Sequence, residues 1–181
     1  MARFITDSDE FSRVLKRAKE VATFEPLAME KWALCHRYFF DEIEVFSIGF
    51  DHVLKSLVEA VGDHRLMVSM LRPDPVKYFY KLFGKYPSVE FDVSEIVRDY
   101  FDVLSSDPGA SLADAITYRR DEMLYYSESF DWFIYTNRDA ELALLVTDRQ
   151  YADINHNLKP YLLSDSEVRQ RLARLPGFDS P

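Results

Sequence analysis

The chain is poor in the residues that several classes of protein require. Its one cysteine, Cys35, excludes a disulfide framework and a cysteine-rich zinc module. Its five glycines argue against a glycine-rich nucleotide-binding fold. The densest apolar stretch, around residues 143–146, is far shorter than the roughly 20 residues of a membrane helix, so we expect no membrane association. The first ten residues, MARFITDSDE, lack the apolar region of a secretory signal, which favours a cytoplasmic protein.

Sequence motifs for phosphate binding and nucleophilic catalysis are also missing. The strings G-x-x-x-x-G-K-[ST], G-x-G-x-x-G and G-x-S-x-G do not occur. His36, His52, His64 and His156 show none of the spacings of a zinc site. We therefore predict no cofactor, no metal and no enzymatic activity.

The composition is that of an ordinary soluble globular protein. Hydrophobic residues make up 48% of the 181 residues and charged residues 29%. The apolar period changes from about 3.6 to 2 near residue 65, without a Pro/Gly/Ser-rich linker. We predict a single domain over 1–181, with a helical part at about 8–62 and a mixed sheet and helix part at about 65–175.

The predicted fold class is α+β, in which the helical N-terminal part packs on a small, mainly antiparallel sheet of four or five strands with further helices. Apolar residues at spacings of three and four predict helices from about residue 8 to 22, 26 to 46, 50 to 61, 76 to 83, 96 to 104 and 165 to 175. Ser111 and Asp114 resemble a capping box and predict a short helix through Ile116. Asp7 or Ser8, Asp74, Ser94, Ser111 and Ser164 are the expected helix caps.

Alternation of apolar and polar residues predicts the strands. Residues 66–70 and 89–93 form two of them, and residues 123–147 form the rest of the sheet around a turn at Asn137-Arg138-Asp139. Residues 141–146 are apolar on both faces, which is typical of a strand covered on both sides. Trp132 shares a strand face with Ile134 and is expected in the core.

The negative charge is concentrated in one segment. The net charge of the chain is −9, and residues 92–141 contain twelve acidic and four basic residues, a net of −8. Such a field repels the phosphates of nucleic acids, so we expect no direct nucleic-acid binding. It would attract a basic protein surface, although a negative surface also serves solubility alone.

The most distinctive stretch runs from Tyr125 to Glu141 and combines aromatic and acidic residues around the predicted turn. Tyrosine, tryptophan and arginine dominate the energetics of protein interfaces. Tyr135 and Arg138 are the expected anchors, and the neighbouring carboxylates are expected to form one anionic surface beside the turn. The predicted partner-binding residues are Asp121, Glu122, Tyr125, Glu128, Asp131, Tyr135, Asn137, Arg138 and Asp139.

Two runs carry a resemblance to a known group of proteins. Pro73-Asp74-Pro75 through Pro87, followed by Trp132 through Leu145, resembles small bacterial proteins grouped with the immunity proteins of polymorphic or contact-dependent toxin systems. The resemblance covers residues 70–147. It implies a non-enzymatic protein that binds and neutralises one cognate toxin, and it assigns a role to no particular residue.

Three hypotheses follow for the function. The first is an acidic immunity protein or antitoxin whose partner is a basic toxin domain. The second is a small enzyme with a site assembled from scattered residues such as Glu128, Asp131, Arg138 and His156. The third is a structural or phage-derived adaptor. The aromatic-rich surface also leaves a homodimer open.

Overall fold

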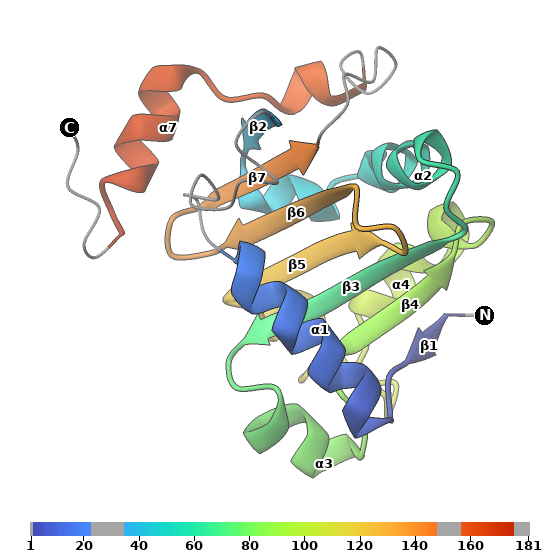
Figure 1. Ribbon diagram of the computed structural model, residues 1–181. Helices are drawn as coiled ribbons and strands as arrows, with labels where there is room; N and C mark the ends of the chain where they lie inside the picture. The colour runs from blue at the N-terminus through green and yellow to red at the C-terminus, as the bar shows by residue number, and fades with distance from the viewer. Residues whose placement is uncertain (1, 23–34, 148–156, 176–181) are drawn as a thin grey trace.

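The computed structural model describes residues 2–22, 35–147 and 157–175. Its centre is one sheet of seven antiparallel strands in the order β1-β4-β3-β5-β6-β7-β2 (Figure 1). The strands are β1 (Arg3–Phe4), β2 (His36–Phe40), β3 (Arg65–Arg72), β4 (Ser88–Asp92), β5 (Glu122–Ser127), β6 (Trp132–Asn137) and β7 (Leu142–Thr147).

Helices cover both faces of the sheet. Helix α1 crosses one face, and α7 lies on the same side next to β7, whereas α2 and α4 pack together on the opposite face (Figure 1). The principal helices are α1 (Ser8–Val21), α2 (Phe50–Ala60), α4 (Ile96–Leu104) and α7 (Asp165–Leu172). The shorter helical segments are η3 (Glu42–Phe46), η4 (Val76–Tyr80), α3 (Lys81–Phe83), α5 (Ile116–Arg119) and η5 (Lys159–Tyr161).

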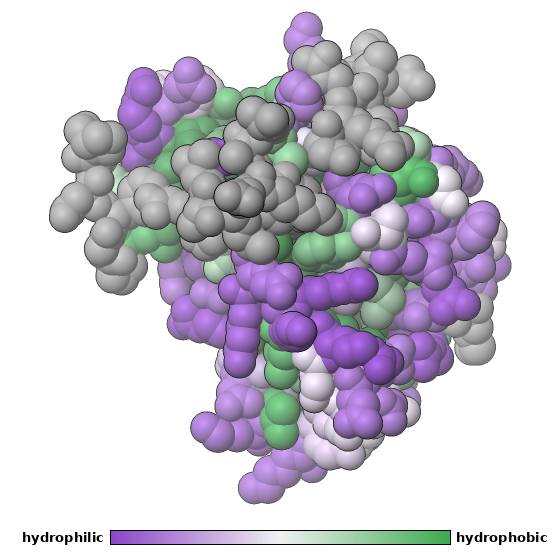
Figure 2. All heavy atoms as spheres, viewed as in Figure 1, coloured by the Kyte–Doolittle hydropathy of each residue, from purple (hydrophilic) through white to green (hydrophobic). Residues whose placement is uncertain are grey.

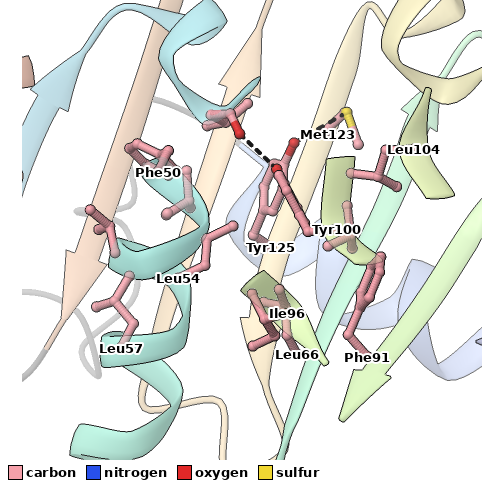
Figure 3. Close-up of a cluster of buried hydrophobic side chains, with 14 of the residues drawn as sticks. Phe50, Leu54, Leu57, Leu66, Phe91, Ile96, Tyr100, Leu104, Met123 and Tyr125 are labelled. Atoms are coloured by element: carbon pink, nitrogen blue, oxygen red, sulfur yellow. Dashed lines mark hydrogen bonds between the residues drawn. The ribbon is translucent and has the colours of Figure 1, made fainter. Parts of the chain in front are cut away.

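The two-sided cover creates two hydrophobic cores. Under α2 and α4, the core contains Leu54, Phe91, Tyr100 and Tyr125 (Figure 3). Under α1, it contains Phe11, Val14 and other buried apolar residues. Every residue of β6 and β7 is buried, as the apolar composition of the last strand predicts.

Several of the predicted caps are present. The Asp7 carboxylate accepts a hydrogen bond from the Glu10 amide at the start of α1. Ser164 and Glu167 form the predicted capping box of α7. Asp74 acts as predicted too, because its carboxylate accepts hydrogen bonds from the Val76 and Lys77 amides at the start of η4. The remaining two, Ser94 and Ser111, differ from the prediction, because α4 begins only at Ile96 and α5 only at Ile116.

The helix predicted over residues 26–46 is wrong for its described part. Residues 36–40 form the edge strand β2, which pairs with β7, and residues 42–46 form η3. Consecutive aromatic residues favour a strand, where Phe39 and Phe40 can reach opposite cores. Residues 26–34 lie outside the described residues. With β2 and the two-residue β1, the sheet has seven strands rather than the four or five predicted.

Candidate functional site

Five of the predicted partner-binding residues meet at one end of the sheet. β5 begins there and β6 ends there, so Glu122 lies opposite Asn137 in the strand register. The Asn137 side chain, itself buried, donates a hydrogen bond to Glu122 over 3.3 Å. The Arg138 amide donates to the Asp121 carbonyl over 2.8 Å. Asp139 follows in the exposed turn.

The charge at this sheet end is largely compensated. Arg72 forms an ion pair with Glu122 at 2.9 Å. The pKa of Arg72 is raised chiefly by its hydrogen bond to Glu122, and the nearby charges of Asp121 and Asp139 add to the effect. Including exposed Arg138, three carboxylates face two guanidinium groups. This sheet end therefore has a net charge of only −1, less than the anionic surface expected beside the turn.

Glu128 and Asp131 lie at the opposite end of the sheet, in the turn between β5 and β6. Glu128 accepts a hydrogen bond from the His64 amide and forms an ion pair with Arg65. The length of β6 separates Asp131 from Arg138 by about 20 Å, because each strand residue advances about 3.3 Å. Of the hypothetical enzyme site, Glu128 and Asp131 thus share one turn while Arg138 lies far from both, and His156 lies outside the described residues.

Tyr125 and Tyr135 are interior residues, not surface anchors. Tyr125 is 0% exposed and points into the core under α2 and α4. Tyr135 is 4% exposed and belongs to the core under α1. Burial raises the pKa of both phenols, that of Tyr135 to about 12. The expectation that these two side chains contact a partner is corrected, because both faces of the sheet are covered.

Helix α4 presents apolar side chains to solvent. Its inner face consists of Ile96, Tyr100 and Leu104, all buried. Val97 and Phe101, four residues apart and hence on one side of the helix, are 40% and 56% exposed. A helix with so wide an apolar stripe has more apolar surface than the core takes up.

Charged residues occupy much of the remaining solvent-facing side of α4. Arg98 forms ion pairs with Glu95 at 3.2 Å and with Asp99 at 2.6 Å. Asp102 is exposed and has no ion-pair partner in the part of the chain that the structure describes. We call this region the α4 surface, and its members are Asp92, Glu95, Val97, Arg98, Asp99, Phe101 and Asp102.

The α4 surface has four carboxylates and one guanidinium group, a net charge of −3. Two of the carboxyls are held ionised. The hydrogen bond from Arg98 lowers the pKa of Asp99, and hydrogen bonds from Ser94 lower the pKa of Asp92. The neighbouring helix α2 adds Asp51, Glu59 and Lys55, a further net of −1. More net negative charge therefore lies on this helical face than beside the β6–β7 turn.

Sequence reasoning located the acidic segment but not this surface. Val97 and Phe101 fit the helical stripe of α4, and spacing alone predicts that they are buried with the rest of it. The sequence does contain a signal for them, since six apolar residues on a nine-residue helix form a wider stripe than one core contact needs.

Over residues 2–22, 35–147 and 157–175, no group of three or more His, Cys, Asp or Glu side chains could hold a metal ion. Within the same ranges no helix has the length and apolar character to cross a bilayer. Comparison of the chain with protein-family models, with curated proteins and with solved structures finds no match.

Proposed function

We propose that this protein is a non-enzymatic binding protein that docks a cationic protein partner on its α4 surface. The observation that supports this most is the pairing of exposed Val97 and Phe101 with carboxylates in excess on a helix anchored in the core. In its concrete form, which the resemblance to immunity proteins implies, the partner is a basic bacterial toxin domain that the protein neutralises.

The apolar pair supplies the contact energy in this proposal. An aromatic side chain in the centre of a dry contact contributes far more than the rim around it. Phe101 has 56% of its surface free to be buried by a partner. Burying it together with Val97 would remove a contiguous apolar strip from water, which favours association.

The helix is held in place before any partner arrives. Tyr100 donates a hydrogen bond to the Val45 carbonyl over 2.8 Å (Figure 3), which ties α4 to η3. Tyr100 also packs against Phe91 of β4. A binding element that is already ordered loses little conformational entropy on association, so more of its contact energy appears as affinity.

The carboxylates supply steering and selectivity. A surface with a net charge of −3 attracts a basic patch, speeds the encounter and makes its rate fall as salt rises. Toxins that act on nucleic acids need basic residues to hold their substrate, so a carboxylate-rich surface can occupy the same residues.

The test is co-expression with the toxin encoded beside the gene for this chain. We expect the chain to restore growth and to co-purify with the toxin. Phe101→Ser should weaken the purified complex by about tenfold or more, and Asp99→Asn with Asp102→Asn should slow association at low salt. Tyr118→Ser is the matched control, because Tyr118 is also exposed and aromatic but lies outside the α4 surface.

Each alternative to the proposed docking predicts a different experimental result. A toxin that stays lethal and forms no complex would overturn the proposed function. If Tyr118→Ser or Arg138→Ala lost binding while Phe101→Ser bound normally, the docking surface would be the end of the sheet near Arg138 and not the α4 surface. A homodimer that Phe101→Ser dissociates would show that a second copy of the chain covers α4, and would contradict the proposal.

A further inference from the structure

A groove lies on the face of the molecule opposite α4, between α1 and the strands beneath it. Its volume is about 500 Å³, within the range of small-molecule sites. Strongly hydrophilic residues cover the middle of this face (Figure 2). The lining residues are Glu10, Arg13, Val14, Lys16, Arg17, Glu20, Arg65, Met67, Glu90, Tyr126 and Glu128.

The α1 wall of the groove is cationic. Arg13, Lys16 and Arg17 follow one another at helical spacing, so they lie close together along this wall. None of the three forms an ion pair with a carboxylate in the described ranges, which sets them apart from most arginines of this protein.

The cations of the opposite wall are paired, one of them partly with Glu10 of α1. Arg3 forms ion pairs with Glu10 and Glu90, and Arg65 with Glu90 and Glu128. Four cations and four carboxylates line the groove, and Arg3 beside it adds a fifth cation, so the local balance is zero without Arg3 and +1 with it, in a molecule whose net charge is −9. On the α1 wall, three cations stand against the two carboxylates of Glu10 and Glu20.

Arg17 packs against two aromatic side chains. Its guanidinium carbon lies 5.4 Å from the centre of the Tyr126 ring and 5.3 Å from that of Phe130. Stacking on aromatic rings uses the flat face of a guanidinium and leaves its N–H edge available for a planar, bidentate contact. Because Arg17 is half-buried, its position is already restricted.

We propose that the α1 groove binds a small phosphate-bearing molecule, with Arg17 as the anchor and Arg13 and Lys16 as the further contacts. Guanidinium groups pair with phosphate oxygens in bidentate fashion, and an ammonium group adds a point charge. A nucleic-acid strand is disfavoured, because its many phosphates would meet the negative field of the whole molecule, whereas a small anion meets only the groove.

The experiment is isothermal titration of the full chain with inorganic pyrophosphate at low salt. We expect saturable binding of one molecule per chain. Arg13→Ala and Lys16→Ala should each weaken binding by about tenfold, since each removes a charged contact from a pre-formed site. Lys19→Ala is the matched control, because Lys19 is an exposed cation of the same helix that does not line the groove.

Arg13 and Lys16 are exposed, so their loss should leave the fold intact, and circular dichroism melting checks this. An absence of saturable binding would overturn the proposal. So would an equal loss in Lys19→Ala, which would indicate diffuse electrostatic attraction. Equal binding of citrate would overturn the assignment to phosphate. None of these results bears on α4, which lies on the other side of the sheet.

Discussion

Glu42 and Arg120 form a buried ion pair in which the side chains are 8% and 6% exposed. The Arg120 guanidinium donates to both Glu42 oxygens, at 3.0 and 3.3 Å, and lies over the Phe46 ring at 4.1 Å. It also donates to the Thr117 carbonyl. The pair thus joins η3 to the end of α5, two segments that no ladder of strands connects.

Removing one partner of this pair should be costly. Glu42→Ala or Arg120→Met leaves a charge buried without its counterion, and we expect a loss of about 3–5 kcal/mol in the free energy of unfolding, measured by urea denaturation. Glu59→Ala breaks the exposed pair with Lys55 and should change stability by less than about 1 kcal/mol. Equal effects of the two substitutions would contradict the buried-pair account.

Buried tyrosines make the stability sensitive to alkaline pH. Burial raises the pKa values of Tyr126 and Tyr135 to about 12. An exposed tyrosine has a pKa near 10. Between pH 10 and 12 the unfolded chain has lost these protons and the folded chain retains them. The free energy of unfolding should therefore fall as pH rises through this window, by at most about 1.4 kcal/mol per pH unit for each tyrosine.

Urea denaturation at pH 8 and at intervals up to pH 12 measures this slope. The double variant Tyr126→Phe, Tyr135→Phe should show a shallower fall. Tyr100 and Tyr125, whose pKa values burial also raises, would still contribute the remaining slope. An identical profile for the variant and the parent chain would show that these two phenols are not linked to folding.

At the scale of elements, the stability of α1 depends on the hydrogen bond that caps its first turn. The Asp7 carboxylate accepts the Glu10 amide at 2.7 Å and satisfies one of the free amides of the first turn. Asp7→Ala should lower the free energy of unfolding by about 1 kcal/mol, whereas Asp7→Asn keeps an acceptor and should lower it less. Thermal melting of both variants checks this, and equal losses would assign the effect to charge rather than to the hydrogen bond.

Elements with a strong local pattern were predictable, and those that depend on distant partners were not. α1, α4 and α7 have apolar stripes at helical spacing, and β3 to β7 alternate or are wholly apolar. β2 failed because its residues satisfy a helical spacing as well as a strand, and its pairing partner, β7, lies about 100 residues further along the chain. β1 is too short for any pattern.

Two residues of the predicted site, Tyr125 and Tyr135, are interior for a related reason. Strand alternation shows that neighbours such as Ile134 and Tyr135 point to opposite faces, but it does not show whether each face is covered. α1 and α7 cover one face and α2 and α4 the other, so Tyr135 is interior. The turn residues Arg138 and Asp139 are exposed as expected.

At the scale of the whole molecule, charge is unevenly divided between the two helical layers. α2 and the α4 surface together have a net charge of −4, whereas α1 has four basic and three acidic residues. The protein and phosphate sites that we propose therefore lie on opposite faces and differ in local charge. A cationic protein and an anionic small molecule could therefore bind at the same time without competing.

By itself the sequence determined a mixed fold with a helical start, an antiparallel sheet and an acidic middle segment, because residue spacing and composition are local properties. Only the tertiary structure decided which carboxylates are compensated by distant guanidinium groups, such as Glu122 by Arg72. It also decided which apolar residues stay exposed. Both depend on which surfaces pack together when the chain folds, and short-range sequence patterns do not determine that packing.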